Sequence, residues 1–168
     1  NSPLKEGKWL KATTIKPGSR QGVHHVLTGF LKEPPKEGRA ATSSWGASVG
    51  GYAVGSESIL MPEDVGTYIP AGGGIGFQMH YTPYGKEAVD TSKMALYFYP
   101  EGQKPERIMR HTVIADNFIE LPPNKDKHQE IAYITFPKEA RLYSVFLHTH
   151  YRGQAGRFDI IYPDGTKK

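Results

Sequence analysis

Apolar and polar residues alternate with a two-residue period along most of the chain, and this alternation limits its fold more than any other feature. Successive side chains of a strand point to opposite faces, so the period predicts strands with one buried face. Eight segments are expected to be strands: 9–15, 22–30, 74–81, 93–100, 107–114, 130–136, 142–151 and 157–162. No segment has helical spacing over three turns, and 19 glycines and 13 prolines suit short strands joined by turns. The sequence predicts an all-β protein, an antiparallel β-sandwich or jelly roll.

Two breaks in this pattern predict how the chain is organised. Residues 32–71 form a long loop-rich stretch, and Pro-Glu-Gly-Gln-Lys-Pro at 100–105 is the best linker. We expect a first jelly-roll domain over residues 1–103 and a partial second one over 104–168. After the turn Pro-Asp-Gly at 163–165 only three residues remain for a returning arm, so the last hairpin is expected to be incomplete. We therefore expect a fragment of a longer chain, or a subunit of a larger assembly.

Composition and missing motifs exclude several classes of function. The net charge is +4 and the lysines are scattered, so nucleic acid is not an expected partner. No apolar run is long enough to cross a bilayer, so the chain is not expected to be transmembrane. Because there is no cysteine, disulfides, thiolate catalysis and blue-copper sites are excluded. Serine-hydrolase elbows, P-loops and dinucleotide fingerprints are also missing.

Histidine is the residue type that carries chemistry here. Five of the seven histidines fall in or at the end of three expected strands: His24, His25, His80, His148 and His150. On a strand, His148 and His150 would share a face and could bind one metal ion. The adjacent His24 and His25 would point to opposite faces of a flat strand, so a shared metal there requires a bulge or local twist. The other two, His111 and His128, have charged neighbours and are expected at the surface.

The histidines alone leave several chemistries open. Imidazole binds copper, zinc, iron or nickel, and three imidazoles from different strands leave coordination positions for a small molecule. Zinc hydrolysis is chemically possible. A cupin-type iron or manganese site would normally add a glutamate soon after the His-x-His pair, and residues 151–156 contain none. A structural β-sandwich with hydrogen-bonded histidines is the remaining alternative.

Three segments in a fixed order resemble a known family. Val-His-His-Val at 23–26, Gln-Met-His-Tyr at 78–81 and His-Thr-His at 148–150 look like the copper type II, ascorbate-dependent monooxygenases. This family includes peptidylglycine α-hydroxylating monooxygenase and dopamine β-hydroxylase. The resemblance extends to Lys-Pro-Gly at 16–18, Asp-Thr-Ser at 90–92 and Phe-Ile-Glu-Leu-Pro-Pro at 118–123. The cysteine-free chain is closer to bacterial members than to the disulfide-bonded animal enzymes.

The resemblance implies two jelly-roll domains that each hold one copper ion. The two domains would face each other across an open cleft. His24, His25 and His80 would hold the first copper, which relays electrons from an external donor. His148 and His150 would be catalytic ligands of a second copper, where dioxygen is activated and a C–H bond of a small organic substrate is hydroxylated. Gln78 would give a hydrogen bond in the outer shell of the first site. Because the family is exported, a periplasmic or extracellular location is expected.

The chain departs from the family at two positions. The family's second copper takes a third ligand from a methionine downstream of the His pair, whereas all four methionines here precede His148. The second site is therefore expected to be incomplete in this chain. Phe146 stands where peptide-amidating members have an arginine for the peptide carboxylate, which argues against a peptidylglycine substrate. A non-catalytic copper-binding or structural subunit is the alternative function.

Overall fold

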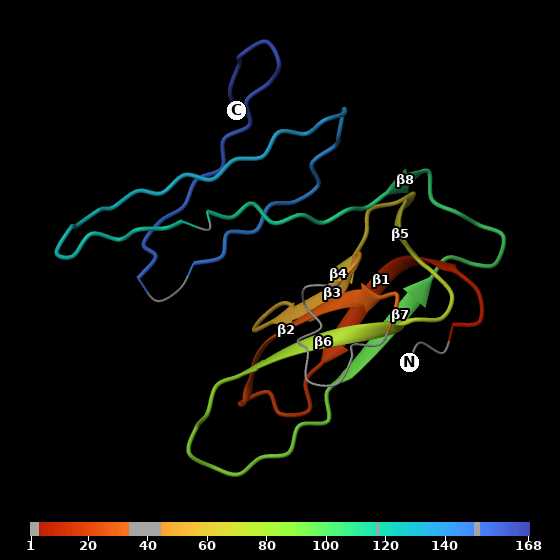
Figure 1. Ribbon diagram of the computed structural model, residues 1–168. Helices are drawn as coiled ribbons and strands as arrows, with labels where there is room; N and C mark the ends of the chain where they lie inside the picture. The colour runs from red at the N-terminus through yellow and green to blue at the C-terminus, as the bar shows by residue number, and fades with distance from the viewer. Residues whose placement is uncertain (1–3, 34–44, 117, 150–151) are drawn as a thin grey trace. The chain divides into compact units, whose positions relative to one another are not determined.

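The computed structural model describes residues 4–33, 45–116, 118–149 and 152–168, and within them every regular element is a β-strand. The predicted all-β class is confirmed. Over the same residues there is no helix of the length and hydropathy needed to cross a membrane. The chain divides into two compact units, Asn1–Val113 and Ile114–Lys168. The ribbon in Figure 1 shows that all eight strands belong to the first unit.

The larger sheet of the first unit has five strands around β1 (Lys8–Lys16). β4 (Ser58–Leu60), β5 (Val65–Ile69) and β7 (Lys93–Phe98) all pair with β1 in antiparallel fashion. β8 (Arg107–Ile108) lies parallel to β5 at the edge. One long strand thus organises the whole sheet.

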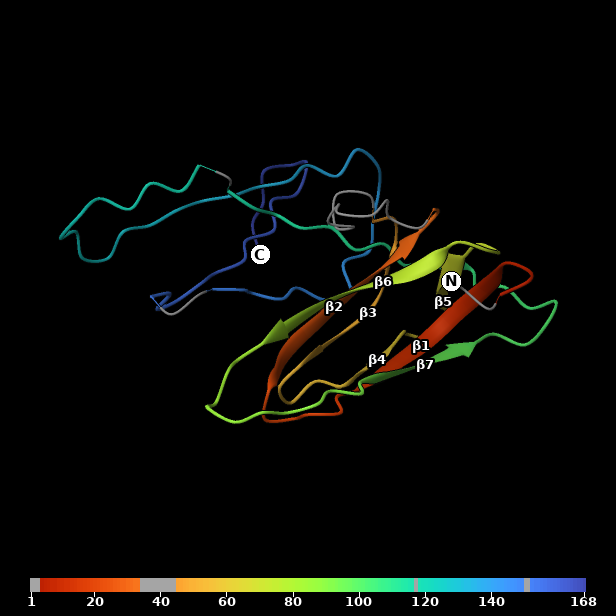
Figure 2. The ribbon, with the colours of Figure 1, turned by 60° about the horizontal axis from the view of Figure 1, so that its bottom comes forward.

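The smaller sheet has three antiparallel strands in the order β3-β2-β6. These are β3 (Ser48–Ala53), β2 (Val23–Leu31) and β6 (Gly74–Tyr81). The two sheets form separate layers of the first unit in Figure 2. This smaller sheet carries the three histidines of the candidate site.

Apolar side chains from both sheets form one core cluster. Ile15 of the larger sheet packs with Val23, Val26 and Tyr52 of the smaller one, and Met79 and Met94 flank them. The sheets approach closely where β3 has a glycine, because a Cβ on Gly50 would lie 2.5 Å from the Thr13 hydroxyl oxygen. The two layers share this core, while the finer jelly-roll topology remains a prediction.

The strands predicted at 9–15, 22–30, 74–81 and 93–100 are present as β1, β2, β6 and β7, within two residues at each end. The prediction of a loop over 32–71 is wrong from residue 48 onward, where β3, β4 and β5 lie. β3 was missed because its two central glycines read as a turn, whereas at Gly50 glycine permits the contact with the other sheet. β4 was missed because it is three residues long.

In the second unit the described residues form no strand. The strands predicted at 130–136, 142–151 and 157–162 are not formed there, and the one predicted at 107–114 shortens to β8. Large apolar side chains of this unit are strongly exposed, with Phe118 at 91%, Tyr133 at 88% and Phe146 at 81%. The alternation is present in the sequence, but it does not bury an apolar face here.

The hairpin at the end of the second unit closes over the three residues that follow its turn. Gly165 adopts a φ of 84° in the turn, and Ile161 pairs with Lys167 in an antiparallel bridge. The Tyr162 N–H donates to the Thr166 carbonyl at 2.9 Å. The short arm that follows the turn thus pairs through an isolated bridge and does not form a strand.

Residues 104–113 lie in the first unit. The β8 pairing with β5 fixes them there, and the Met109 N–H donates to the Gly66 carbonyl at 2.8 Å. A Cβ on Gly66 would lie 2.9 Å from the Pro105 ring, so this stretch packs closely on β5. The first unit thus continues beyond the expected linker at 100–105.

Candidate metal centre

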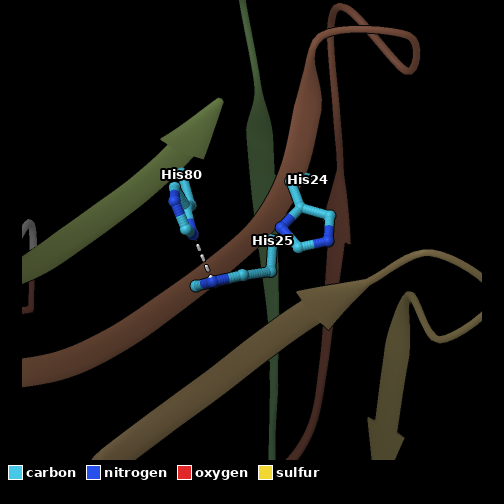
Figure 3. A group of neighbouring side chains, drawn as sticks. All are labelled: His24, His25 and His80. Atoms are coloured by element: carbon cyan, nitrogen blue, oxygen red, sulfur yellow. Dashed lines mark hydrogen bonds between the residues drawn. The ribbon is translucent and has the colours of Figure 1, made fainter. Parts of the chain in front are cut away.

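Neighbouring strands bring His25 and His80 face to face. β2 and β6 are antiparallel, and their register pairs His25 directly with His80. The ring nitrogens His80 Nδ1 and His25 Nε2 lie 2.6 Å apart, as the dashed line in Figure 3 shows. Directly opposed residues of such a pair share one face of the sheet, so this contact follows from the backbone register.

A β-bulge brings His24 to the same place. Val23 pairs with Tyr81 and His25 with His80, so His24 is an extra residue without a partner position on β6. Bulges of this kind redirect a side chain that would otherwise point to the opposite face. The His24 ring centre lies 5.3 Å from that of His25 and 5.5 Å from that of His80. The β-bulge that a metal ion shared by His24 and His25 requires is therefore present.

The donor set fits a single metal ion held by imidazole alone. One ligand nitrogen from each of the three histidines lies within 4.8 Å of the others. Nitrogen ligands about 2.0–2.1 Å from a tetrahedral ion are about 3.3 Å from each other, so His25 and His80 must separate and His24 must approach by small ring rotations. Among the described residues, no cysteine or carboxylate belongs to this group. Imidazole suits copper, zinc, iron or nickel.

The centre is open to solvent on one side and anchored in the core on the other. His24 and His80 are exposed and His25 is half-buried, whereas the neighbouring Val23 and Val26 are buried. The ligands thus sit on a strand held by the core while their rings remain accessible. Such a site can exchange electrons or ligands with a molecule in solution.

Gln78 lies two residues before His80 on β6, so the two side chains share one face of the strand. Its register partner on β2 is Leu27, and both side chains are exposed. The structure thus places Gln78 beside the centre. Its predicted outer-shell hydrogen bond remains a prediction.

The second predicted histidine pair belongs to the other unit. His148 is exposed, lies outside any strand, and is not a member of the three-histidine group. His150 lies outside the described residues. The strand that would place the two rings on one face is not formed over the described part of 142–151.

The two remaining histidines differ from each other. His111 is exposed, as predicted. His128 was also predicted to be exposed, and this is wrong: its side chain is only 18% exposed, and its Nε2 lies 2.5 Å from Glu130 Oε1. A charged neighbour two residues away in the sequence thus acts as its partner, which the sequence argument did not consider.

Sequence reasoning assigned no role to Asp90, which lies beside the centre. Burial alone would raise the pKa of Asp90, but hydrogen bonds from the Ser19 N–H, Ser92, Tyr81 and the Gly18 N–H lower it overall. Burial and the hydrogen bond to Asp90 raise the pKa of Tyr81. The Asp-Thr-Ser run predicts only local hydrogen bonds in a turn. The N–H groups that Asp90 accepts from are 72 and 71 residues away, so the sequence held no signal for them.

Comparison of the chain with protein-family models, with curated proteins and with solved structures finds no match in any of the three.

Proposed function

We propose that this chain is a copper-dependent monooxygenase module whose first copper ion is held by His24, His25 and His80. The observation that supports this most strongly is the three-imidazole cluster, with all ligand atoms within 4.8 Å. The ordered resemblance of the three histidine segments to the copper type II monooxygenases favours copper over zinc, iron or nickel. An all-imidazole site suits a copper ion that changes oxidation state, since imidazole is a ligand for both states.

In this proposal each residue has a defined task. Copper, when bound, supplies one-electron redox chemistry. His24, His25 and His80 hold it at an exposed position that an external donor such as ascorbate can reach. By resemblance, His148 and His150 would hold the second copper, which would supply the redox chemistry for hydroxylating a C–H bond of a small organic substrate with dioxygen. Phe146 disfavours a peptidylglycine substrate, and the location is periplasmic or extracellular.

A non-catalytic copper-binding or structural subunit is the second candidate. It is favoured by one observation: His148 is exposed and lies outside any strand in the described part of the second unit. A catalytic centre needs ligands whose positions are fixed by their surroundings. In that case the first unit would still bind copper, and no turnover would follow.

Dioxygen consumption by the copper-loaded chain tests the enzyme against the alternative. The assay combines ascorbate with a panel of small organic substrates and detects hydroxylated products by mass spectrometry. We expect product from the wild-type chain and none after His80→Ala or the double change His148→Ala and His150→Ala. Turnover that survives the double change would exclude the proposed second site. Copper binding without product from the wild type would support the non-catalytic subunit. The exposed His111→Ala is the matched control.

A further inference from the structure

One carboxylate joins the two chain segments that flank the histidine centre. Asp90 Oδ1 accepts hydrogen bonds from the Gly18 and Ser19 N–H groups, each at 2.9 Å. Asp90 Oδ2 accepts one from the Tyr81 hydroxyl at 3.0 Å. The Ser92 hydroxyl lies 2.9–3.0 Å from both oxygens. We call Asp90 and these four partners the Asp90 clasp.

The clasp is linked directly to the bulge that carries His24. The Ser19 carbonyl accepts a hydrogen bond from the Val23 N–H at 2.9 Å, and Val23 immediately precedes His24. On the other strand, Tyr81 immediately follows His80. The Gly22 carbonyl accepts a hydrogen bond from the Thr82 N–H at 2.8 Å. Asp90 thus ties together the start of β2 and the end of β6, where the register shifts.

Gly18 shows that this approach is tight. A Cβ there would lie 2.4 Å from the Thr91 backbone nitrogen and 2.8 Å from Asp90 Oδ1. The contact with Thr91 is with backbone rather than with a flexible side-chain end, so it cannot be relieved by a rotamer change. Only glycine lets the loop after β1 come close enough for both N–H groups to reach the carboxylate.

We propose that Asp90 is a positioning residue for the three-histidine centre, acting through the backbone of the β2 bulge. The carboxylate touches none of the three imidazoles. It holds the Ser19 turn against Tyr81, and this keeps the extra residue His24 close enough to His25 and His80 for the three rings to reach a shared ion. The inference rests on the proposed metal site and adds the residue that sets its geometry.

A structural role and a positioning role predict different results for Asp90→Ala. None of the clasp residues belongs to the apolar core cluster, so the two sheets keep their packing in the variant. The bulge loses its anchor, and His24 samples positions away from the other two rings. We expect copper(II) affinity to fall about 10-fold, at the lower end of the 10–100-fold losses seen when outer-shell partners are removed. The copper EPR signal should change as well.

Two further variants refine the test. Asp90→Asn should restore part of the affinity, because an amide oxygen still accepts hydrogen bonds from the two backbone N–H groups. Gly18→Ala should reproduce the effect from the opposite side of the clasp. Gly74→Ala is its control, since a Cβ at Gly74 meets nothing within 4 Å although Gly74 starts the strand that carries His80.

The experiment measures copper(II) affinity by chelator competition, copper EPR and the apo melting temperature for each variant. Asp164→Ala is the matched control, because Asp164 makes a similar turn with Thr166 in the other unit. Weakened affinity with an altered EPR signal in Asp90→Ala, but not in Asp164→Ala, supports the inference. Wild-type affinity and signal in Asp90→Ala overturn it.

The two possible failures give different results. A wild-type chain that binds no copper would overturn the proposed metal site itself. A wild-type chain that binds copper, together with an Asp90→Ala variant that binds equally well, would overturn only the role of Asp90. If Asp90→Ala does not fold, Tyr81→Phe decides, since it removes one hydrogen bond from the clasp and keeps the ring. An unchanged affinity and EPR signal in folded Tyr81→Phe would then contradict the proposal.

Discussion

The two units of this chain carry similar histidine motifs, but their backbones differ in secondary structure. In Asn1–Val113 the histidines lie on paired strands over a buried core, and three rings converge. In Ile114–Lys168 the described residues form no strand, and His148 is exposed. In the first unit, spacing along the chain does not by itself bring the rings together. Register with a second strand brings His25 to His80, and a bulge adds His24.

Hydrogen exchange should show the largest difference between the units. Amides in the paired strands β1, β2 and β6 are expected to exchange at least about 10³-fold more slowly than unprotected ones, since opening them requires unfolding the core. Amides of residues 118–149 and 152–159 should exchange close to the unprotected rate, because these residues form no strand. Exchange followed by mass spectrometry after proteolysis measures both. Equal protection in both units would contradict the comparison.

Removing a histidine should weaken copper binding at the first site only when that histidine belongs to the three-histidine group. His80→Ala leaves two of the three imidazoles, so affinity at this site should fall by more than about 100-fold, beyond the loss for an outer-shell partner. His148→Ala should leave the affinity of this site unchanged, because His148 is not a member of the group. Chelator competition measures both, with His111→Ala as the control. A similar loss in both variants would contradict the assignment of the first site to these three histidines.

Truncation of an apolar side chain should lower the free energy of unfolding much more in the first unit than in the second. Leu10 is completely buried in β1, so Leu10→Ala should lower the free energy of unfolding by about 2–5 kcal/mol. Phe146 is 81% exposed, and Phe146→Ala should change it by less than about 0.5 kcal/mol. Urea denaturation followed by far-UV circular dichroism measures both. A large loss for Phe146→Ala would show that the second unit has a core of its own.

Acid should weaken the Asp90 clasp, with a smaller effect than the three above. The folded state lowers the pKa of Asp90, so the unfolded chain binds the proton first as the pH falls. The stabilisation is complete well above the ordinary aspartate pKa of about 3.9, declines below it, and is lost as the pH falls through the folded-state pKa. The difference in melting temperature between wild type and Asp90→Ala should therefore shrink from pH 7 to pH 3.

The same acid titration has a control in the second unit. The pKa of Asp164 is also lowered, by its hydrogen bonds from Thr166. Because the described residues of that unit include no buried hydrophobic side chain, Asp164→Ala should leave the melting temperature of the first unit unchanged at every pH. A difference between wild type and Asp90→Ala that grows toward acid would have the wrong sign for this account.

The sequence allowed a prediction of the long strands and of which histidines to consider. The alternation located β1, β2, β6 and β7, because each of them buries one face in the core. It failed for β3, where Gly50 serves packing between the sheets rather than a turn. It also failed in the second unit, because alternation records only a tendency and a strand forms only with a partner.

For the site, spacing pointed to His24, His25 and His80, but only the register shift explains how adjacent histidines can meet one ion. A bulge depends on pairing between two strands, so a single segment does not reveal it. Asp90 was missed for a related reason. Its four partners come from three separate stretches of the chain, which the fold brings together.

The most direct test of the three-imidazole centre is copper EPR with pulsed detection of nitrogen couplings, on the chain loaded with one equivalent of copper(II). The account predicts a type II signal with couplings from three imidazoles. The couplings should fall to two in His24→Ala and stay at three in His111→Ala. Couplings from only two imidazoles in the wild-type chain, or a signal that His24→Ala leaves unchanged, would contradict it.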